Sequence, residues 1–364
     1  MKVVSVDLGE RSYPVYIGGD IAHLGAAARE FDLGEKVLVI STAPIASLYG
    51  RKVRDVLDSV GFQVFLARVP DGEKYKTLSQ AAKLYEECAE DKLDRDSTIL
   101  ALGGGVIGDL AGFVASTYLR GINFIYLPTT LLAQVDASIG GKVGVDLPQG
   151  KNLVGSFYQP RFVYMDLRVL RTLPQAQIRA GLAEIIKYGV IEDEDLFLYL
   201  EENLEKIKTL SLDCLEYIIT RCAKIKAGVV REDEREKRGK RQVLNFGHTI
   251  GHAIESATGY GRYSHGEAVA VGMIAAARIA NKMGVFPENP LVRLTDLVRR
   301  ADLPIRVEGV NGGKLWDALY LDKKIRGKKL CFVLPRKIGE VFLTDKVPLA
   351  LVREAIRELG VENE

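Results

Sequence analysis

The sequence predicts an α/β protein in which an N-terminal Rossmann-like parallel-sheet domain is followed by a mostly α-helical metal-binding domain. Three observations support this class. From residue 36 onward, strands alternate with amphipathic helices, which is typical of a parallel sheet covered by helices. Three consecutive glycines, 103–105, join an apolar strand to a helix. From Gln175 onward nearly every segment has helical periodicity, so we expect domains at residues 1–174 and 175–364.

The composition limits the classes of function. A chain of 364 residues that is 47% hydrophobic can bury two sizeable cores. It contains no run of ~18 apolar residues and begins directly with an alternating strand, so we expect a cytoplasmic protein without a signal peptide. A net charge of +2 argues against nucleic acid as the main partner. The scattered cysteines predict buried, reduced thiols at Cys88, Cys214, Cys222 and Cys331.

The chain before the glycine run predicts the first half of the sheet. Four strands are expected, at residues 3–8, 13–17, 36–41 and 62–69, and the first two form a hairpin. Helices are expected at residues 21–31, in a stretch ending at Val60, and at residues 78–91. The polar turn PDGEKYKT, residues 70–77, is a candidate ligand loop, although taken alone an ordinary solvated loop explains it better.

The segment STILALGGGVIGDLAGFVAST, residues 97–117, carries the strongest loop signal. Its glycines let backbone N–H groups approach a phosphate at the start of the helix, and Gly108 and Gly112 allow close packing of that helix on the sheet. A glycine-rich turn without a ligand is the alternative. The next strand ends at Thr129 and Thr130, at the carboxyl edge where open α/β sheets bind ligands.

Residues 134–160 are too rich in glycine and polar residues for a helix, so we expect a long functional loop. Asp136, Lys142, Lys151 and Asn152 in this loop suit a phosphorylated or carboxylated ligand. A flexible surface loop is the competing interpretation. A strand at residues 162–167 then closes the first domain.

The second domain opens with a helix in which Glu184 lies among small and apolar residues. A carboxylate in such a setting is unfavourable unless it is paired or binds metal, so Glu184 is a candidate metal ligand. A surface salt bridge with Lys187 is the alternative. A long helix at residues 212–230 carries Lys226, and the charge run that follows is expected to be solvated except for Arg241 at its end. Two short strands, residues 329–335 and 339–344, precede a terminal helix.

Three of the four histidines lie between residues 241 and 269. His248 and His252 are four residues apart and share one helix face, and His265 follows a glycine-rich turn. Neutral imidazole is the commonest biological metal ligand, and catalytic zinc uses three protein ligands. Thr249 occupies the position where HExxH needs glutamate, which argues against a metalloprotease. A pair of core histidines remains the competing interpretation.

Six segments, in order and covering most of the chain, resemble the 3-dehydroquinate synthase family: GGGVIGDLAGFVAST, PTTLLAQVDASIGGKVGVD, KNLVGSFYQP, AGLAEIIKYG, LNFGHTIGHAIE and SHGEAVAVGM. Other sugar-phosphate cyclases share several of these motifs. The resemblance implies a homodimeric lyase of the shikimate pathway that binds NAD and a divalent metal, zinc or cobalt. Such an enzyme converts 3-deoxy-D-arabino-heptulosonate 7-phosphate to 3-dehydroquinate and phosphate, and its NAD is reduced and reoxidised within each turnover.

The resemblance also implies roles for individual residues. The metal ligands would be Glu184, His248 and His265, which revises the pairing suggested by spacing, because His252 would contact the substrate. The cofactor contacts would be Asp71, Gly72, Glu73, Lys74, Gly104, Gly105, Val106, Asp109, Thr129, Thr130, Lys142, Lys151, Thr172 and Leu173. The substrate contacts would be Asp136, Lys142, Asn152, Lys187, Lys226, Arg241, Asn245, His252, Lys324 in preference to Lys323, and Arg120 from the partner subunit.

Several alternatives stay open at this point. Thr42 stands where relatives often carry an acidic or amide residue near the adenosine ribose, which leaves the preference for NAD over NADP undecided. A cyclase of a neutral sugar phosphate, such as 2-deoxy-scyllo-inosose synthase, is the main rival. Glycerol-dehydrogenase-like oxidoreductases have aspartate in place of Glu184 and lack Lys142 and Asn152, and a non-catalytic NAD-binding regulator would not need three metal ligands. A guanidinium suits a carboxylate, so we expect Arg241, helped by Lys226, to bind the carboxylate of the heptulosonate.

Overall fold

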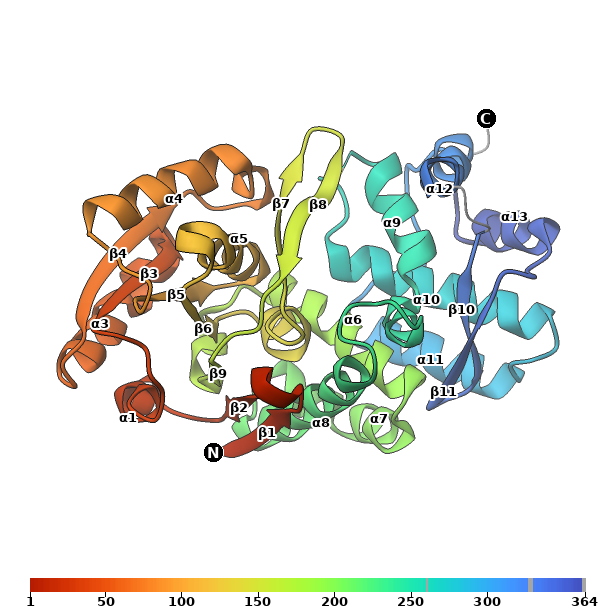
Figure 1. The fold of residues 1–364 in the computed structure, drawn as a ribbon. Helices are drawn as coiled ribbons and strands as arrows, with labels where there is room; N and C mark the ends of the chain where they lie inside the picture. Colours follow the sequence, from red (N-terminus) through yellow and green to blue (C-terminus); the bar gives the residue numbers. More distant parts are fainter. Residues whose placement is uncertain (260, 327–329, 362–364) are drawn as a thin grey trace. The chain divides into compact units, whose positions relative to one another are not determined.

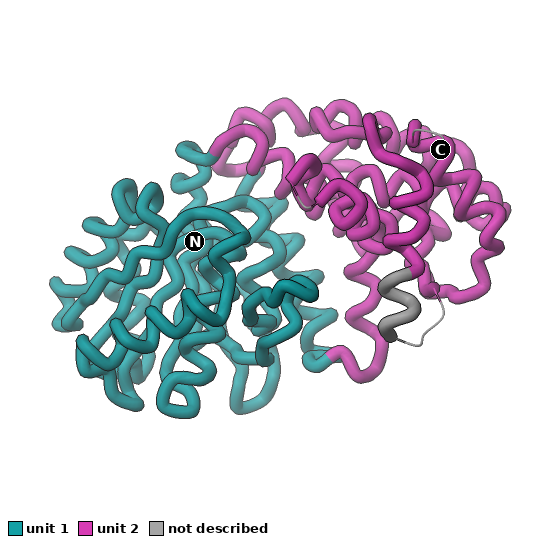
Figure 2. Tube along the Cα trace, turned by 90° about the horizontal axis from the view of Figure 1, so that it is seen from above, with its two compact units in different colours: residues 1–173, 215–235 teal, residues 174–214, 236–364 magenta. Residues whose placement is uncertain are grey.

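The chain divides into two compact units, shown in Figure 2. The computed structural model describes residues 1–259, 261–326 and 330–361, with the backbone alone for 321–326. Unit 1 comprises residues 1–173 and 215–235, and unit 2 comprises residues 174–214 and 236–364. The division after Leu173 lies next to the expected boundary, but residues 215–235, which we expected in the second domain, pack with unit 1.

Unit 1 is built on a seven-stranded sheet (Figure 1). Its strand order is β1 (Lys2–Val6), β2 (Tyr13–Ile17), β9 (Phe162–Met165), β6 (Asn123–Pro128), β5 (Thr98–Gly103), β3 (Lys36–Thr42) and β4 (Gln63–Val69). The expected hairpin of β1 and β2 is antiparallel, and the pairs from β2 to β4 are parallel. This arrangement confirms the predicted class for the N-terminal part.

The core of unit 1 includes the interior strand β5, whose residues are all buried. An uninterrupted apolar strand is expected where helices cover both faces of a parallel sheet. On one face Leu100 and Leu102 join a cluster with Leu24 and Val53, which come from α1 (Leu24–Ala28) and α3 (Arg51–Asp58). The remaining helices of this unit are α2 (Ala43–Ile45), α4 (Leu78–Glu90), α5 (Gly105–Thr117) and most of α8 (Leu212–Glu232).

The expectation of a long loop at residues 134–160 is wrong. The segment forms a π-helical turn, Ala133–Ala137, and then an antiparallel hairpin of β7 (Lys142–Leu147) and β8 (Gly150–Phe157). Its glycines obscured the alternation of Val143 and Val145, whose side chains are buried. The backbone of this hairpin is fixed to the preceding polar turn, because Asp146 N donates to Lys76 O at 2.7 Å.

Unit 2 is mostly helical, as predicted. Its elements are α6 (Gln175–Ile191), α7 (Glu194–Lys208), α9 (His248–Ala257), α10 (His265–Lys282), α11 (Glu288–Arg300), α12 (Gly312–Arg326), α13 (Leu349–Glu358) and the ribbon β10 (Phe332–Lys337) with β11 (Glu340–Thr344). Helix α10 is central, because every residue from Ala268 to Ala280 is buried except Arg278, which is half-buried. It packs against α6, α9, α11 and α13.

Among the described residues, no helix is both long enough and apolar enough to cross a membrane. Cys88, Cys214 and Cys222 are buried and form no disulfide, as expected. Cys331 is exposed, so that part of the prediction is wrong; the residue precedes β10 and lies outside the paired ribbon.

Candidate functional site

Three helices of unit 2 bring Glu184, His248 and His265 together. Glu184 lies in the middle of α6, whereas His248 and His265 are the first residues of α9 and α10. One ligand atom from each residue falls within 4.8 Å of the other two. The Nε2 atoms of His248 and His265 lie 3.7 and 3.6 Å from the same oxygen, Glu184 Oε1. This is a convergent set of two imidazoles and one carboxylate.

Glycine contacts set how closely the three helices approach. A Cβ atom on Gly272 of α10 would lie 1.9 Å from the carbonyl oxygen of Gly247, which precedes α9. A Cβ atom on Gly266 of α10 would lie 2.4 Å from the Cα of Ala180 in α6. Both distances are too short for any other residue. The absence of these two side chains therefore lets α10 hold His265 next to the ligands on α9 and α6.

Glu184 does pair with Lys187, but not in the surface salt bridge that the sequence offered as an alternative. Its Oε2 forms a short ion pair with Lys187 Nζ, and its Oε1 faces the two imidazoles. The pair is buried and not on the surface, since the side chains of Lys187 and Glu184 are 2% and 1% exposed. A buried carboxylate requires such compensation, and the lysine directs the second oxygen toward the histidines.

The other ring nitrogens of the two histidines are also engaged. His248 Nδ1 lies 3.2 Å from the carbonyl oxygen of Phe246, and His265 Nδ1 lies 3.4 Å from Glu255 Oε2. Metal-binding histidines usually donate this second N–H to a carbonyl or carboxylate, which fixes the tautomer and aims the free nitrogen. His252, paired with His248 by spacing, is exposed, and its ring centroid lies 5.3 Å from that of His248.

The electrostatics of the cluster suit a divalent cation. Burial lowers the pKa of His248 to about 3, so this imidazole is neutral and able to bind metal. Burial also opposes a charge on His265, but the carboxylates of Glu184 and Glu255 outweigh it and raise the pKa of His265 to about 10. Two carboxylates thus attract positive charge to His265, and a bound metal ion can supply that charge in place of a proton. The residues present fit a metal such as zinc.

The glycine turn of unit 1 forms the expected helix start. Gly104 precedes α5, and a Cβ atom on Gly108 would lie 2.3 Å from the ring of Tyr126 in β6, which confirms the close packing of this helix on the sheet. Thr129 Oγ1 is buried and has no hydrogen-bond partner within the described residues. A buried hydroxyl beside a helix N-terminus fits a polar ligand such as a dinucleotide.

Lys76 lies at the centre of the polar groups near this turn, and the sequence reasoning missed it. Its side chain is 4% exposed, and its Nζ lies 2.7 Å from Glu73, 3.3 Å from Asp109 and 3.6 Å from Asp146. Lys76 Nζ also donates to Asn152 Oδ1 at 2.9 Å. Lys76 therefore joins three residues that the resemblance assigned to cofactor or substrate. The sequence signal for Lys76 was its place in the candidate ligand turn, residues 70–77. The same turn contains Lys74, whose side chain is exposed.

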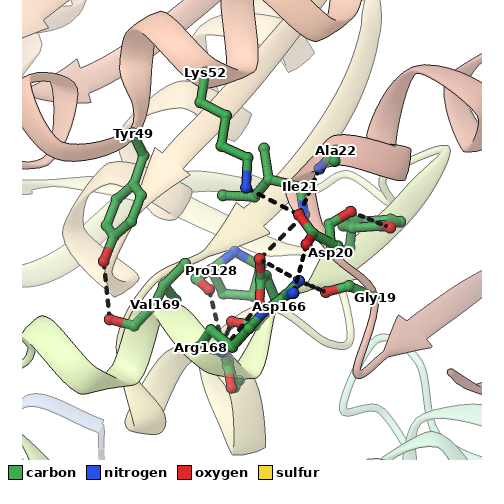
Figure 3. Close-up of polar contacts among 12 residues, drawn as sticks. Gly19, Asp20, Ile21, Ala22, Tyr49, Lys52, Pro128, Asp166, Arg168 and Val169 are labelled. Atoms are coloured by element: carbon green, nitrogen blue, oxygen red, sulfur yellow. Dashed lines mark hydrogen bonds and ion pairs between the residues drawn. The ribbon is translucent and has the colours of Figure 1, made fainter.

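The segment that ends at Thr172 and Leu173 is anchored by an ion-pair network (Figure 3). Arg168 contacts Asp20 Oδ2 at 2.5 Å and Asp166 Oδ1 at 2.9 Å. Hydrogen bonds from Ala22 N, Lys52 and Arg168 hold the pKa of Asp20 well below its usual range. Tyr49 donates to the carbonyl of Val169 at 3.2 Å. The hydroxyl of Tyr49 also lies 2.6 Å from Thr172 Oγ1. These contacts hold Thr172 in place after β9.

Other candidate residues are found in varied settings. Lys226 Nζ contacts Asp136 Oδ1 at 2.7 Å, so these two substrate candidates meet in unit 1.

Arg241 is 3% exposed, which excludes a solvated continuation of the basic run, and its Nε lies 3.7 Å from Glu236. The exposed candidates of the described chain are Asp71, Lys74, Arg120, Lys142, Lys151, Asn152, Thr172, Asn245 and His252. The side chain of Lys324 lies outside the described residues. Thr42 is buried at the end of β3.

The chain matches two family models that adjoin each other. Residues 66–180 match the 3-dehydroquinate synthase N-terminal family, and residues 181–325 match the C-terminal one. A 3-dehydroquinate synthase from Desulforamulus reducens is 50% identical over 343 residues, which cover 94% of this chain and 95% of that one.

Solved structures give the same assignment at the level of the fold. A 2-deoxy-scyllo-inosose synthase complexed with carbaglucose-6-phosphate, NAD+ and Co2+ is 32% identical, with a TM-score of 0.88 and coverage of 98% of this chain and 100% of that one. The 2-epi-5-epi-valiolone synthase of Streptomyces hygroscopicus subsp. jinggangensis 5008, with NAD+ and Zn2+ bound, is 26% identical over 97% and 98% of the chains, with a TM-score of 0.89. A glycerol dehydrogenase from Schizosaccharomyces pombe is 16% identical over 95% and 88% of the chains, with a TM-score of 0.66, and shares the fold alone. The chain belongs to the 3-dehydroquinate synthase family.

Proposed function

We propose that this protein is a 3-dehydroquinate synthase that converts 3-deoxy-D-arabino-heptulosonate 7-phosphate to 3-dehydroquinate and phosphate. The observation that carries the proposal is 50% identity to a 3-dehydroquinate synthase over 94% of the chain. The cluster of Glu184, His248 and His265 supports the part of the proposal that requires a metal. The glycine turn ahead of α5 supports the part that requires a dinucleotide.

We propose zinc as the metal in unit 2, because two imidazoles and one carboxylate are a frequent ligand set of catalytic zinc with an open position. When bound, the metal supplies Lewis acidity to a substrate alcohol, and NAD supplies a hydride acceptor. Glu184 would bind the ion through Oε1 while Lys187 holds Oε2. His248 and His265 would bind it through Nε2, because their Nδ1 atoms are engaged elsewhere.

For NAD, we propose the start of α5 as the site of the pyrophosphate. The backbone N–H groups at a helix N-terminus and the positive end of its dipole stabilise bound phosphate. Thr129 would donate its buried hydroxyl to the cofactor. Lys76 and Asp109, which lie 3.3 Å apart, would fix the polar side of the same site.

The test of the activity is release of phosphate from the heptulosonate phosphate by the purified protein. Catalytic amounts of NAD should suffice, because oxidation and re-reduction act on one substrate molecule. NADH that accumulates in step with product would indicate an ordinary dehydrogenase. Absence of phosphate release with metal and NAD both present would refute the proposed reaction.

Arg241 distinguishes a cyclase that acts on a carboxylated sugar phosphate from one that acts on a neutral sugar phosphate. Its burial favours a bidentate, charge-assisted pair with a substrate carboxylate. We expect Arg241→Ala to lower kcat/KM for the heptulosonate phosphate by about 2–5 kcal/mol of transition-state binding. The matched control is Lys240→Ala, since Lys240 is exposed. Faster turnover of glucose 6-phosphate by the unmodified protein, or full activity of Arg241→Ala, would favour a neutral-sugar cyclase.

We also propose a homodimer in which Arg120 serves the site of the partner subunit. Leu119 and Arg120 have φ values of 48° and 71°, and Leu119 is 39% exposed. Left-handed backbone at non-glycine residues is unfavourable and often marks functional positions. Arg120→Ala and His265→Ala should each be inactive alone, and mixed dimers should regain part of the activity. A monomer in sedimentation, or no recovery on mixing, would contradict the proposal.

A further inference from the structure

Glu255 is a buried carboxylate that the reaction described above does not use. It lies on α9 and is 6% exposed. Counting from His248, it follows at position i+7 and His252 at i+4, so the three residues share one face of the helix. Its Oε2 lies 3.4 Å from His265 Nδ1, on the side of the ring away from Glu184. A buried carboxylate requires compensation, and the His265 imidazole provides part of it.

The two metal-site imidazoles are held by different kinds of partner. His248 Nδ1 contacts a neutral carbonyl, and the side chain of His248 is 13% exposed. The side chain of His265 is 34% exposed, so protein packing restricts it less. A carboxylate on Nδ1 would both fix the ring and increase the electron density at Nε2. The more exposed ligand thus has the stronger anchor.

We propose that Glu255 is the positioning residue of the metal site, orienting His265 through Nδ1 and strengthening the bond that Nε2 makes to the ion. This inference rests on the proposed metal site. A different arrangement is a second cation held by His252, Glu255 and His265, whose ligand atoms also lie within 4.8 Å of one another. That arrangement would require His265 to bind ions through both nitrogens, and therefore to lose both ring protons.

The test uses the full chain, stripped of metal by chelation and titrated with Zn2+ against a chromophoric chelator. Glu255→Gln keeps the size and the hydrogen-bond acceptor but removes the charge, and we expect zinc binding to weaken about 10- to 100-fold. Glu255→Ala, which removes both, should bind more weakly still. The visible spectrum of the Co2+ form should change in both variants, because the geometry of one ligand changes.

Glu267→Gln is the matched control, because Glu267 is two residues from His265 and belongs to the capping box with Ser264 that starts α10. It should lower thermal stability slightly and leave zinc affinity and the Co2+ spectrum unchanged. If Glu255→Gln and Glu255→Ala both kept the zinc affinity and the Co2+ spectrum of the wild type, the role of Glu255 would be overturned. The metal site itself would stand. Two zinc ions per wild-type chain, with the second one lost in Glu255→Gln, would replace that role with a second cation site. No zinc binding by the wild-type protein would refute both this inference and the metal site beneath it.

Discussion

A buried lysine in each unit of the molecule contacts carboxylates, and the two lysines are compensated differently. Lys187 in unit 2 forms an ion pair with Glu184, whose other oxygen faces two imidazoles. Lys76 in unit 1 faces Glu73, Asp109 and Asp146 within 3.6 Å. The first is a balanced pair beside the proposed metal ligands, and the second lysine faces more carboxylates than it can neutralise. A buried lysine thus pairs with one carboxylate beside the proposed metal ligands, and holds three carboxylates together beside the proposed cofactor turn.

The two lysine clusters also differ in the backbone elements that hold them. The cluster of unit 2 lies on three packed helices whose spacing is set by glycine contacts, which suits a metal that demands fixed distances. The cluster of unit 1 joins a polar turn, a helix start and the β7–β8 hairpin, which are separate segments held by the lysine itself. Removing the central lysine should therefore have different consequences in the two units.

The largest expected effect is loss of the metal. Chelation, or His265→Ala, should reduce turnover to background, because three ligands are needed to hold catalytic zinc. Zinc or cobalt should restore the chelated wild-type protein. His23→Ala is the control, since His23 is an exposed histidine of unit 1. The metal content and the phosphate release are measured on the same chelated sample. Full phosphate release without metal would contradict a catalytic metal site in unit 2, and with it the contrast between the two clusters.

The second effect concerns the lysines themselves. Lys187→Met and Lys76→Met each leave buried carboxylate charge uncompensated, and each should lower the free energy of unfolding by about 3–5 kcal/mol in the metal-free protein. Saturating zinc should restore much of the lost stability in Lys187→Met, because the ion neutralises Glu184. In Lys76→Met, zinc should stabilise the protein only as much as it stabilises the wild type. Urea unfolding with and without zinc measures both, with the exposed Lys74→Met as control. An equal gain in stability on zinc binding in Lys187→Met and Lys76→Met would contradict the difference between the two lysines.

The smallest effect is a pH dependence in unit 1. Burial raises the pKa of Asp109 from 3.8 to about 6, although Lys76 opposes this. Between about pH 4 and 6 the folded protein therefore keeps a proton that the unfolded chain has lost, so stability falls as pH rises through this window. The decrease amounts to at most ~3 kcal/mol. Asp109→Asn should flatten this slope and weaken NAD binding; parallel urea midpoints for the two proteins from pH 4 to 7 would contradict the assignment.

Much of the fold could be predicted because it depends on local patterns. The apolar strand β5, the glycine turn and the helix that follows are contiguous in sequence, and their alternation indicated the parallel sheet. The hairpin of β7 and β8 was missed because glycine and polar residues hide its alternation. Its pairing is fixed in part by Lys76 O, which lies outside the segment.

The candidate site was predictable only where residues share an element. Spacing joined His248 and His252, which lie on one helix face, but it could not show that His265 approaches Glu184, because that depends on how α10 packs on α6 and α9. The set of Glu184, His248 and His265 came from the resemblance. Glu255 could have been suspected from its helical register with His248, whereas the burial of Lys76 depends on segments far apart in the sequence.

The division of the chain also has a consequence for its synthesis. Residues 215–235 complete unit 1, where Arg11 pairs with Glu234 and Asp136 pairs with Lys226, but residues 174–214 of unit 2 separate them from the first 173. A chain emerging from the ribosome must therefore wait for part of α8 before its first unit can close. A fragment ending at Leu173 would contain all seven strands of the sheet and still lack these partners, so it should be prone to proteolysis and aggregation until the missing helix is supplied.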